Sequence, residues 1–310
     1  MKKRSHLNRQ KPLKLRLIQH WQLYLLLLPA VLYLLIFNYA PLYGLVIAFQ
    51  DYKPYLGYLG SPFIGLKNFV RFFHSNKFGE IIPNTLVISF YSLLAGFPFP
   101  IILALCLNYI PAVRFKKIVQ NITYAPYFIS TVVLVSMLTI FFSQSSGLVN
   151  NVRDALGLER LLYMGDAKAF RHLYVWSGVW QSVGWNSIIY FAGLSNVDES
   201  LHEAAIVDGA TILQRIRYID LPSIRPVIVT LFIMNTGKIM SIGFEKAYLM
   251  QNSLNMTTSE IISTYVYKIG LLNQQYSYST AINLFNSVVN LALLLSVNTI
   301  SKKLSDTSIL

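Results

Sequence analysis

Long uncharged stretches, separated by short polar segments, dominate the sequence. Five of them each exceed the ~20 residues that a helix needs to cross the hydrocarbon core of a bilayer, namely residues 21–50, 81–113, 118–152, 173–197 and 269–301. A sixth stretch, residues 227–250, is interrupted by Lys238, Glu245 and Lys246. The pattern predicts an all-α integral membrane domain over residues 21–301, with six transmembrane helices.

The segments between these stretches predict loops and short helices. Residues 66–73 and 149–156 each have the length and pattern of a short helix within an outer loop. Residues 251–279 carry Glu260 and Lys268 and are too polar to predict a seventh span. Proline residues inside the predicted spans are expected to kink their helices, since proline lacks the N–H of the helical ladder.

Composition and charge support a membrane protein with both ends in the cytoplasm. The 310 residues are 54% hydrophobic and 13% charged, with a net charge of +13. Residues 1–20 form a basic arm without an acid, as expected of a cytoplasmic end, and an even number of spans returns residues 302–310 to the same side. Because the positive charge follows topology, nucleic acid is not an expected partner. The first apolar run is also longer than the ~7–15 residues of a cleaved signal peptide.

Residues 197–225 form a polar loop on the cytoplasmic side. The Glu and Ala content of residues 201–208 predicts a helix, and Gly209 suits the left-handed turn that ends one. Thr211 is expected to cap a second helix that Leu221 and Pro222 terminate. The apolar stripe of that second helix is Ile212, Ile216 and Ile219.

Together these residues resemble the "EAA" signature of the permease subunits of binding-protein-dependent ABC importers. The matching positions are Glu203, Ala204, Ala205, Gly209, Ile219, Leu221 and Pro222. Asp208, which lies between them, is a further candidate for the coupling contact. Residues 39–52, 61–69, 243–248 and 276–281 are similar to the carbohydrate-uptake, maltose-type branch, especially permeases for complex oligosaccharides. The resemblance implies a type I ABC importer transmembrane-domain fold in the bacterial cell membrane, with residues 197–225 as the coupling loop.

The resemblance also implies partners. Permeases of this family work with a second six-span permease subunit, two cytoplasmic ATPase subunits and an extracellular or periplasmic sugar-binding protein. The permease subunits themselves lie in membrane lipid. The sequence lacks a Gly-x-x-x-x-Gly-Lys-Ser/Thr loop, and its one Gly-Lys pair, Gly237-Lys238, lies in an apolar stretch. We therefore expect a non-enzymatic transport subunit with no cofactor of its own, while the ATPase binds ATP and Mg²⁺.

In the coupling loop, the resemblance implies that Glu203 pairs with a basic group on the ATPase, that Ala204 and Ala205 permit close approach, and that Gly209 makes the bend. A solvated carboxylate at the start of a helix is the alternative for Glu203. Asp208 could cap the helix or pair with Arg215 or Arg217.

A substrate path is expected where polar residues enter the apolar stretches. In a continuous helix Asn235, Lys238, Ser241 and Glu245 would share one face, and charges at membrane depth usually face a bundle interior or a cavity. Trp180, Trp185 and Asn186 add aromatic surface and an amide, as a sugar site needs. The alternatives are that the charges join helices or mark the interface, and that the tryptophans pack or form a belt.

Other functional classes fit the sequence less well. A secondary carrier usually needs intramembrane carboxylates, and only Glu245 is available. A membrane enzyme needs a cluster of His, Asp, Glu or Cys at membrane depth, whereas every histidine lies at an end or in a loop and Cys106 stands alone. We thus predict no catalytic or metal-binding residue. An ABC permease for a substrate other than sugar remains an alternative.

Overall fold

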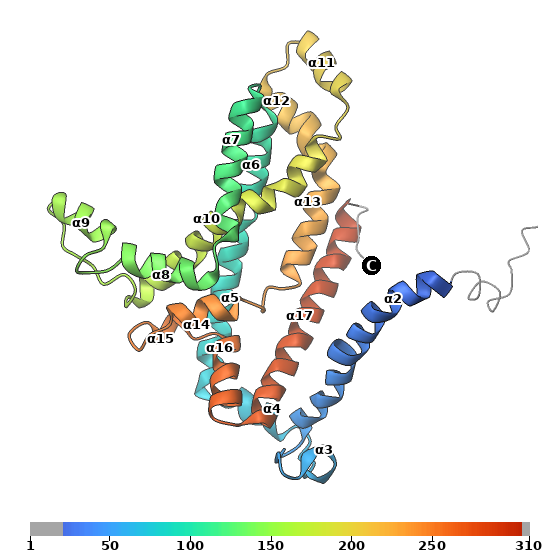
Figure 1. Ribbon diagram of the computed structural model, residues 1–310, viewed down its shortest axis with the longest axis vertical. Helices are drawn as coiled ribbons and strands as arrows, with labels where there is room; N and C mark the ends of the chain where they lie inside the picture. Colours follow the sequence, from blue (N-terminus) through green and yellow to red (C-terminus); the bar gives the residue numbers. More distant parts are fainter. Residues whose placement is uncertain (1–20, 306–310) are drawn as a thin grey trace, which may run out of the picture.

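The protein is helical throughout the part that the structure describes. The computed structural model describes residues 21–305, so the basic arm 1–20 and residues 306–310 lie outside it. Within the described range the only β-type pairing is an isolated bridge between Gln50 and Phe63. The all-α prediction is confirmed. Figure 1 shows helices gathered along one long axis, with α11 (Glu199–Val207) and α12 (Ile212–Arg215) at one end.

The first apolar stretch is one long helix of changing type. It runs through α2 (Trp21–Leu34), the π turn η1 (Leu35–Tyr39) and the 3₁₀ helix η2 (Ala40–Phe49). Pro41 begins the 3₁₀ part, where the sequence predicts a kink. No residue of α2 is buried, and Figure 1 shows α2 standing apart, while η2 packs against α17 (Tyr276–Ser305). The side chains of α2 therefore lie free to contact lipid or another membrane chain.

The next two predicted spans behave differently. Helices α5 (Asn76–Gly96) and α6 (Pro98–Asn108) form one apolar helix interrupted only at Phe97. In contrast, α7 (Val113–Tyr124) with η3 (Ala125–Phe128) meets α8 (Thr131–Phe141) at an angle of 99°. Residues 118–152 are therefore not one straight helix, and their assignment to a single span stays a prediction. The chain leaves the helix at Ile129, and Ser130 starts a new helix by accepting a hydrogen bond from Val133 N–H.

Helix α10 (Ala167–Leu194) lies at the centre and packs against α5, α6 and α13 (Leu221–Thr236). Three clusters of buried apolar side chains hold the helices together. One joins α10 to α5, α8 and α14 (Phe244–Met250), and another joins α10 to α6 and α13. The third joins α4 (Lys67–Phe73) and α5 to α17 and the segment that precedes it.

The sixth predicted stretch is not one helix. Helix α13 ends at Thr236, residues 237–240 form a turn, and α14 starts only at Phe244. The prediction of a continuous span over residues 227–250 is therefore wrong.

Two short helices predicted in outer loops are confirmed as α4 and α9 (Leu148–Ala155). The remaining short elements are α3 (Gly57–Gly60), α15 (Met256–Ser259), α16 (Ile262–Tyr267) and the π turn η5 (Lys268–Leu272).

By length and composition, three helices of the described chain can cross a membrane: Trp21–Phe49, Asn76–Asn108 and Tyr276–Thr299. The bent pair Val113–Phe128 and Thr131–Phe141 makes a fourth if it is one span. Helix α10 is long enough but more polar, with Gln181, Ser182 and Asn186 in its second half. Helix α13 has only 16 residues. The count of six spans therefore stays a prediction.

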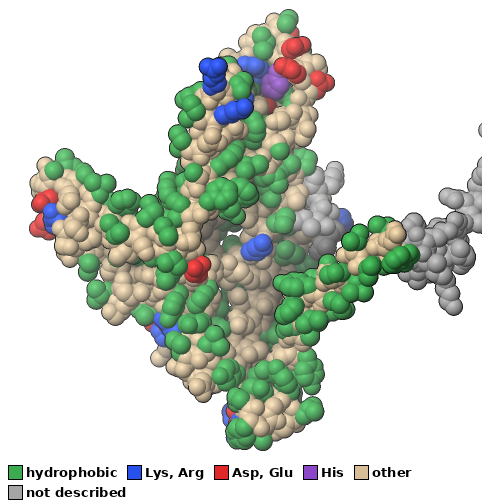
Figure 2. Space-filling model, in the orientation of Figure 1, with side chains coloured by type: hydrophobic (Ala, Val, Ile, Leu, Met, Phe, Trp, Pro, Cys, Tyr) green, Lys and Arg blue, Asp and Glu red, His purple; other side chains and the backbone are tan. Residues whose placement is uncertain are grey.

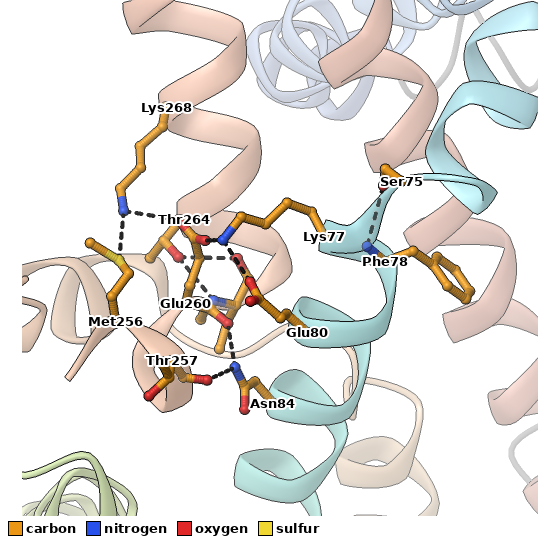
Figure 3. Close-up of polar contacts among 11 residues, drawn as sticks. Ser75, Lys77, Phe78, Glu80, Asn84, Met256, Thr257, Glu260, Thr264 and Lys268 are labelled. Atoms are coloured by element: carbon orange, nitrogen blue, oxygen red, sulfur yellow. Dashed lines mark hydrogen bonds and ion pairs between the residues drawn. The ribbon is translucent and has the colours of Figure 1, made fainter. Parts of the chain in front are cut away.

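A buried carboxylate fastens the segment before α17 to α5. Glu260 accepts hydrogen bonds from Lys77 Nζ at 2.7 Å and from Lys268 Nζ at 3.1 Å (Figure 3). Asn84 Nδ2 donates to the Thr257 and Glu260 carbonyl oxygens nearby. Burial alone would raise the pKa of Glu260, but the two lysines outweigh it and hold that pKa below its ordinary value of 4.5. The Glu260 carboxylate thus links α5 to the segment before α17 through two ion pairs.

We predict that Glu260→Gln destabilises the protein by about 1–2 kcal/mol, because two lysines then face an uncharged amide. The stabilisation is fully present above the unfolded-state pKa of Glu260 and is lost as the pH falls through the lower folded-state pKa. Thermal unfolding of the purified complex at neutral and acidic pH measures both effects. Glu80→Gln is the matched control, since Glu80 binds the same Lys77 Nζ but is 48% exposed. Equal effects of the two variants would contradict the prediction.

Candidate functional site

The predicted cytoplasmic loop folds as two short helices joined by a sharp turn. Asp198 caps α11 by accepting a hydrogen bond from Ser200 N–H, which lowers the pKa of its carboxyl. At the other end Gly209 has φ +76°, Gly209 N–H donates to Ile206 O and Ala210 N–H donates to Ala205 O. These two bonds form a Schellman motif, which needs a residue without a Cβ at its left-handed position. The predicted helix and glycine turn are confirmed.

The second helix begins as predicted but does not end as predicted. Thr211 and Gln214 form a capping box at the start of α12, with Gln214 Oε1 accepting from Thr211 N–H at 2.7 Å. The chain then passes through the π turn η4 (Ile216–Asp220) directly into α13. Leu221 and Pro222 therefore open α13 rather than stop a helix. Proline is tolerated in the first turn, where its missing N–H is not needed.

The π turn also alters the predicted apolar stripe. Ile212 is exposed, whereas Ile216 and Ile219 are half-buried, and Ile216 packs on the cluster between α10 and α13. Because a π turn adds a residue to the helical repeat, spacings of four and seven do not keep these three side chains on one face.

Asp220, inside the π turn, lies at the junction between the loop and the membrane helices. Its side chain is fully buried. Tyr109 OH, at the end of α6, donates to Asp220 Oδ2 at 2.6 Å, and His202 Nε2, on α11, lies 3.2 Å from Oδ1. The guanidinium of Arg215 stands 5.3 Å from the centre of the Tyr109 ring. The Asp220 carboxylate therefore links the end of α6 and α11 to the π turn that precedes α13. The sequence analysis missed Asp220, although an acid directly before a Leu-Pro pair was a visible signal.

The signature residues themselves lie mostly on the surface. Glu203, Ala204, Asp208, Gly209 and Pro222 are exposed, while Ala205, Ile219 and Leu221 are half-buried. Among the described residues Glu203 and Asp208 make no ion pair, so the predicted Asp208 pairing with Arg215 or Arg217 is absent there. Glu203 thus remains available to either of its two predicted roles.

Apolar side chains accompany these polar ones at the end of the molecule. Val207 is 87% exposed and Leu213 is 75% exposed, one on each side of the Gly209 turn. Leu201, Ile206, Ile212 and Tyr218 are exposed as well. Figure 2 shows several charged side chains and a histidine at the same end, and further charged side chains lie elsewhere on this face among many hydrophobic ones. Such an apolar surface rimmed by charge is typical of a protein docking site.

A cavity of about 970 Å³ lies further along the molecule, between α5, α6, α10, α13 and the break before α14. Its size is within the range of ligand-binding cavities. Five of the seven predicted path residues line it: Trp185, Asn186, Asn235, Lys238 and Ser241. Trp180 and Glu245 do not line it. The prediction that Asn235, Lys238, Ser241 and Glu245 share a helical face is wrong, because the helix ends at Thr236.

Two details of the lining bear on its chemistry. Trp185 stacks on Tyr127 with ring centres 4.5 Å apart, so one indole face is already covered by protein. Ser241 Oγ accepts a hydrogen bond from Asn290 Nδ2 at 2.9 Å, which ties the broken segment to α17. The cavity therefore has an ordered aromatic wall and an irregular backbone segment held in place.

Lys246, which lies in the apolar stretch 227–250, was not among the predicted path residues. Lys246 is 9% exposed and lines the cavity. Its Nζ donates to Tyr174 O at 2.7 Å and lies 4.8 Å from the centre of the Tyr174 ring. The signal that could have revealed it is the pair Glu245-Lys246 in an apolar stretch, where only one of two neighbouring charges can turn inward.

Comparisons with known proteins identify the family of this chain. Residues 96–306 match the family of binding-protein-dependent transport system inner membrane components. The chain is 42% identical over 301 residues to the polygalacturonan/rhamnogalacturonan transport system permease protein YteP of Bacillus subtilis (strain 168), covering 97% of this chain and 94% of that protein. It is 30% identical to the arabinooligosaccharides transport system permease protein AraP of the same organism, covering 91% and 88%.

A solved structure agrees over the whole fold. It is a chain of a bacterial ABC transporter involved in the import of the acidic polysaccharide alginate, with a TM-score of 0.89 and 38% identity, covering 95% of this chain and 100% of that one. A structure of a bacterial alginate ABC transporter in complex with alginate pentasaccharide-bound periplasmic protein matches with a TM-score of 0.89 and 38% identity, covering 96% of this chain and 100% of that one. This chain is therefore a multi-pass membrane protein that belongs to the family of inner membrane components of binding-protein-dependent transport systems, the permease subunits of ABC importers.

Proposed function

We propose that this protein is one six-span permease subunit of an ATP-driven importer for oligosaccharides and that it forms half of the translocation path. The coupling loop is the observation that carries the proposal: a rigid, doubly capped helix pair with an exposed apolar turn at one end of the membrane helices. Nothing in a simple carrier requires such a surface. The cavity supports the saccharide part, since its amides, hydroxyls and aromatic rings suit a sugar.

The relatives support the same substrate class. The names of the two relatives and the structural neighbour refer to polygalacturonan and rhamnogalacturonan, arabinooligosaccharides and alginate, which are all carbohydrates of several units. A cavity of about 970 Å³ in one subunit is roomy enough for several sugar rings once a second subunit completes it.

The partners follow from the two surfaces. Val207, Leu213 and Glu203 would enter a cleft of a cytoplasmic ATPase subunit, which binds ATP and Mg²⁺ and performs the hydrolysis. The uncovered apolar surface of α2 would lie in lipid or against a second permease subunit. A sugar-binding protein would deliver substrate at the opposite end. In this arrangement both ends of the chain are cytoplasmic, and α10 and the α12–α13 segment complete the six spans.

The test is the reconstituted complex of this chain with its second permease, ATPase and binding-protein partners. We expect oligosaccharides to stimulate ATP hydrolysis and to accumulate in proteoliposomes. Stimulation by peptides or amino acids, with none by any carbohydrate, would overturn the saccharide assignment. Transport by this chain alone, without an ATPase, would overturn the importer assignment.

We predict that Gly209→Pro abolishes uptake and substrate-stimulated ATP hydrolysis, while the chain still inserts into the membrane. Proline fixes φ near −65°, whereas Gly209 has φ +76°, so the turn between α11 and α12 cannot form. Gly157→Pro is the matched control. Gly157 has φ +71° and its N–H also donates to a carbonyl three residues earlier, but it follows α9, away from the coupling loop. Wild-type uptake by Gly209→Pro would rule out docking through this turn.

We further predict that Asp220→Leu lowers the amount of sugar transported per ATP hydrolysed severalfold. The variant leaves Tyr109 OH and His202 without their carboxylate, at a cost of about 1–3 kcal/mol for buried groups, and it disconnects α11 from α6. Asp220→Asn keeps an acceptor for Tyr109 and is expected to fall between wild type and Asp220→Leu. The ratio of uptake to hydrolysis in proteoliposomes measures the effect. A lower melting temperature with an unchanged ratio would mean that Asp220 only stabilises the fold.

A further inference from the structure

The charge of the cavity is one-sided. Two lysines, Lys238 and Lys246, line it, and no Asp or Glu is among its described lining residues. The one carboxylate next to them in sequence, Glu245, is exposed and is not among the lining residues. A cavity with cations and no anions carries a positive potential, which low-dielectric surroundings strengthen.

Lys246 is held in place without a carboxylate. Its ammonium group lies against the Tyr174 carbonyl oxygen and ring, and no described residue forms an ion pair with it. Gly178 makes room for it, because a Cβ at that position would stand 3.2 Å from Nζ. An ammonium group has three N–H donors, and the Tyr174 carbonyl takes one. A buried cation with donors to spare is costly unless an anion joins it.

Other lining groups also lack partners. The side chains of Lys238, Asn186 and Asn235 make no hydrogen bond or ion pair with any described residue, and all three face the cavity. Lys238 and Asn235 belong to the place where α13 ends and the helix breaks. A continuous helix would distribute these polar groups around its circumference. The break instead exposes them to the cavity.

We propose that Lys246 and Lys238 bind carboxylates of the transported sugar, so that the substrate is an acidic oligosaccharide containing uronic acid units. This inference rests on the proposed function and deepens it. Lys246 is the fixed, desolvated site for one carboxylate of the sugar. Lys238, on the exposed turn, binds a further carboxylate along the path. Neutral hydroxyls and ring faces of the sugar meet Asn186, Asn235 and Trp185. A neutral sugar would leave the ammonium of Lys246 without a counter-charge.

The experiment compares charged and uncharged forms of one sugar. Oligogalacturonides and alginate oligosaccharides are each paired with their fully methyl-esterified form of the same chain length, together with neutral arabino-oligosaccharides. Uptake and stimulated ATP hydrolysis are measured in proteoliposomes holding the complete complex with its binding protein. The variants are Lys246→Met, Lys238→Met and Lys246→Arg. Lys67→Met is the control, since Lys67 is an exposed lysine of α4 that does not line the cavity.

We expect the acidic oligosaccharides to be transported in preference to their esters. Lys246→Met should lower uptake of the acidic form by about tenfold or more, as loss of a charge-assisted hydrogen bond does. Where an ester is transported, the same variant should leave its uptake unchanged. Lys246→Arg should keep the preference for charge, and Lys67→Met should behave as wild type. Lys238→Met should have a smaller effect in the same direction. Basal ATP hydrolysis and assembly of the complex check that each variant is folded.

The failures are distinguishable. If neutral oligosaccharides are transported and acidic ones are not, the acidic class is overturned and the oligosaccharide importer stands. Equal transport of the acidic and esterified forms would overturn the role of the lysines in binding carboxylates. The same holds if Lys246→Met and Lys238→Met leave acidic uptake unchanged or lower the uptake of both forms equally. The lysines would then serve structure, for instance by pairing with a carboxylate of another subunit. If no carbohydrate stimulates hydrolysis at all, the proposed function itself fails.

Discussion

Backbone groups inside a bilayer have no water to bind, so each N–H and C=O must find a partner within the protein. This constraint makes the membrane-spanning segments helical and decides where helices can break. Two of the breaks, at Phe97 and over residues 237–243, lie against the cavity rather than lipid. The freed polar groups there find partners such as Asn290, which holds both Met240 N–H and Ser241 Oγ. The irregular segment is tolerated because protein surrounds it, and it supplies the polar lining of the cavity.

The same requirement shapes the coupling end in another way. A proline at residue 222 cannot continue an ordinary helical ladder, and the π turn before it lets the helix start again without a break in direction. Asp220 sits in this turn, buried between the end of α6 and α11. A rigid contact of this kind transmits movement better than a flexible linker, because α11 cannot shift without displacing the carboxylate that α6 and α13 share. In the proposed importer, the coupling between the docking surface and the cavity would be a free energy shared by two distant sites.

Local signals in the sequence were sufficient for the features that depend on neighbouring residues. The Gly209 turn, the Thr211 cap and the short helices α4 and α9 follow from residues within one turn of each other, and the structure contains all of them. Hydrophobic length alone could not reveal the 99° bend between η3 and α8 or the break after Thr236. Both depend on packing against α10 and α17, which are far away in sequence. Asp220 and Lys246 were missed for the same reason, since their partners lie 111 and 72 residues away.

The position of Lys246 in the cavity changes how the proposed substrate path would work. A polar stripe on a straight helix would have placed Lys238 and Glu245 together, and their charges would have neutralised each other in a cavity suited to uncharged sugars. The break separates them: Glu245 faces outward, whereas Lys246 turns inward against Tyr174. The cavity thereby gains a second cation and loses its only candidate anion. The preference for a charged cargo would therefore originate in a backbone irregularity that hydrophobic patterning alone does not show.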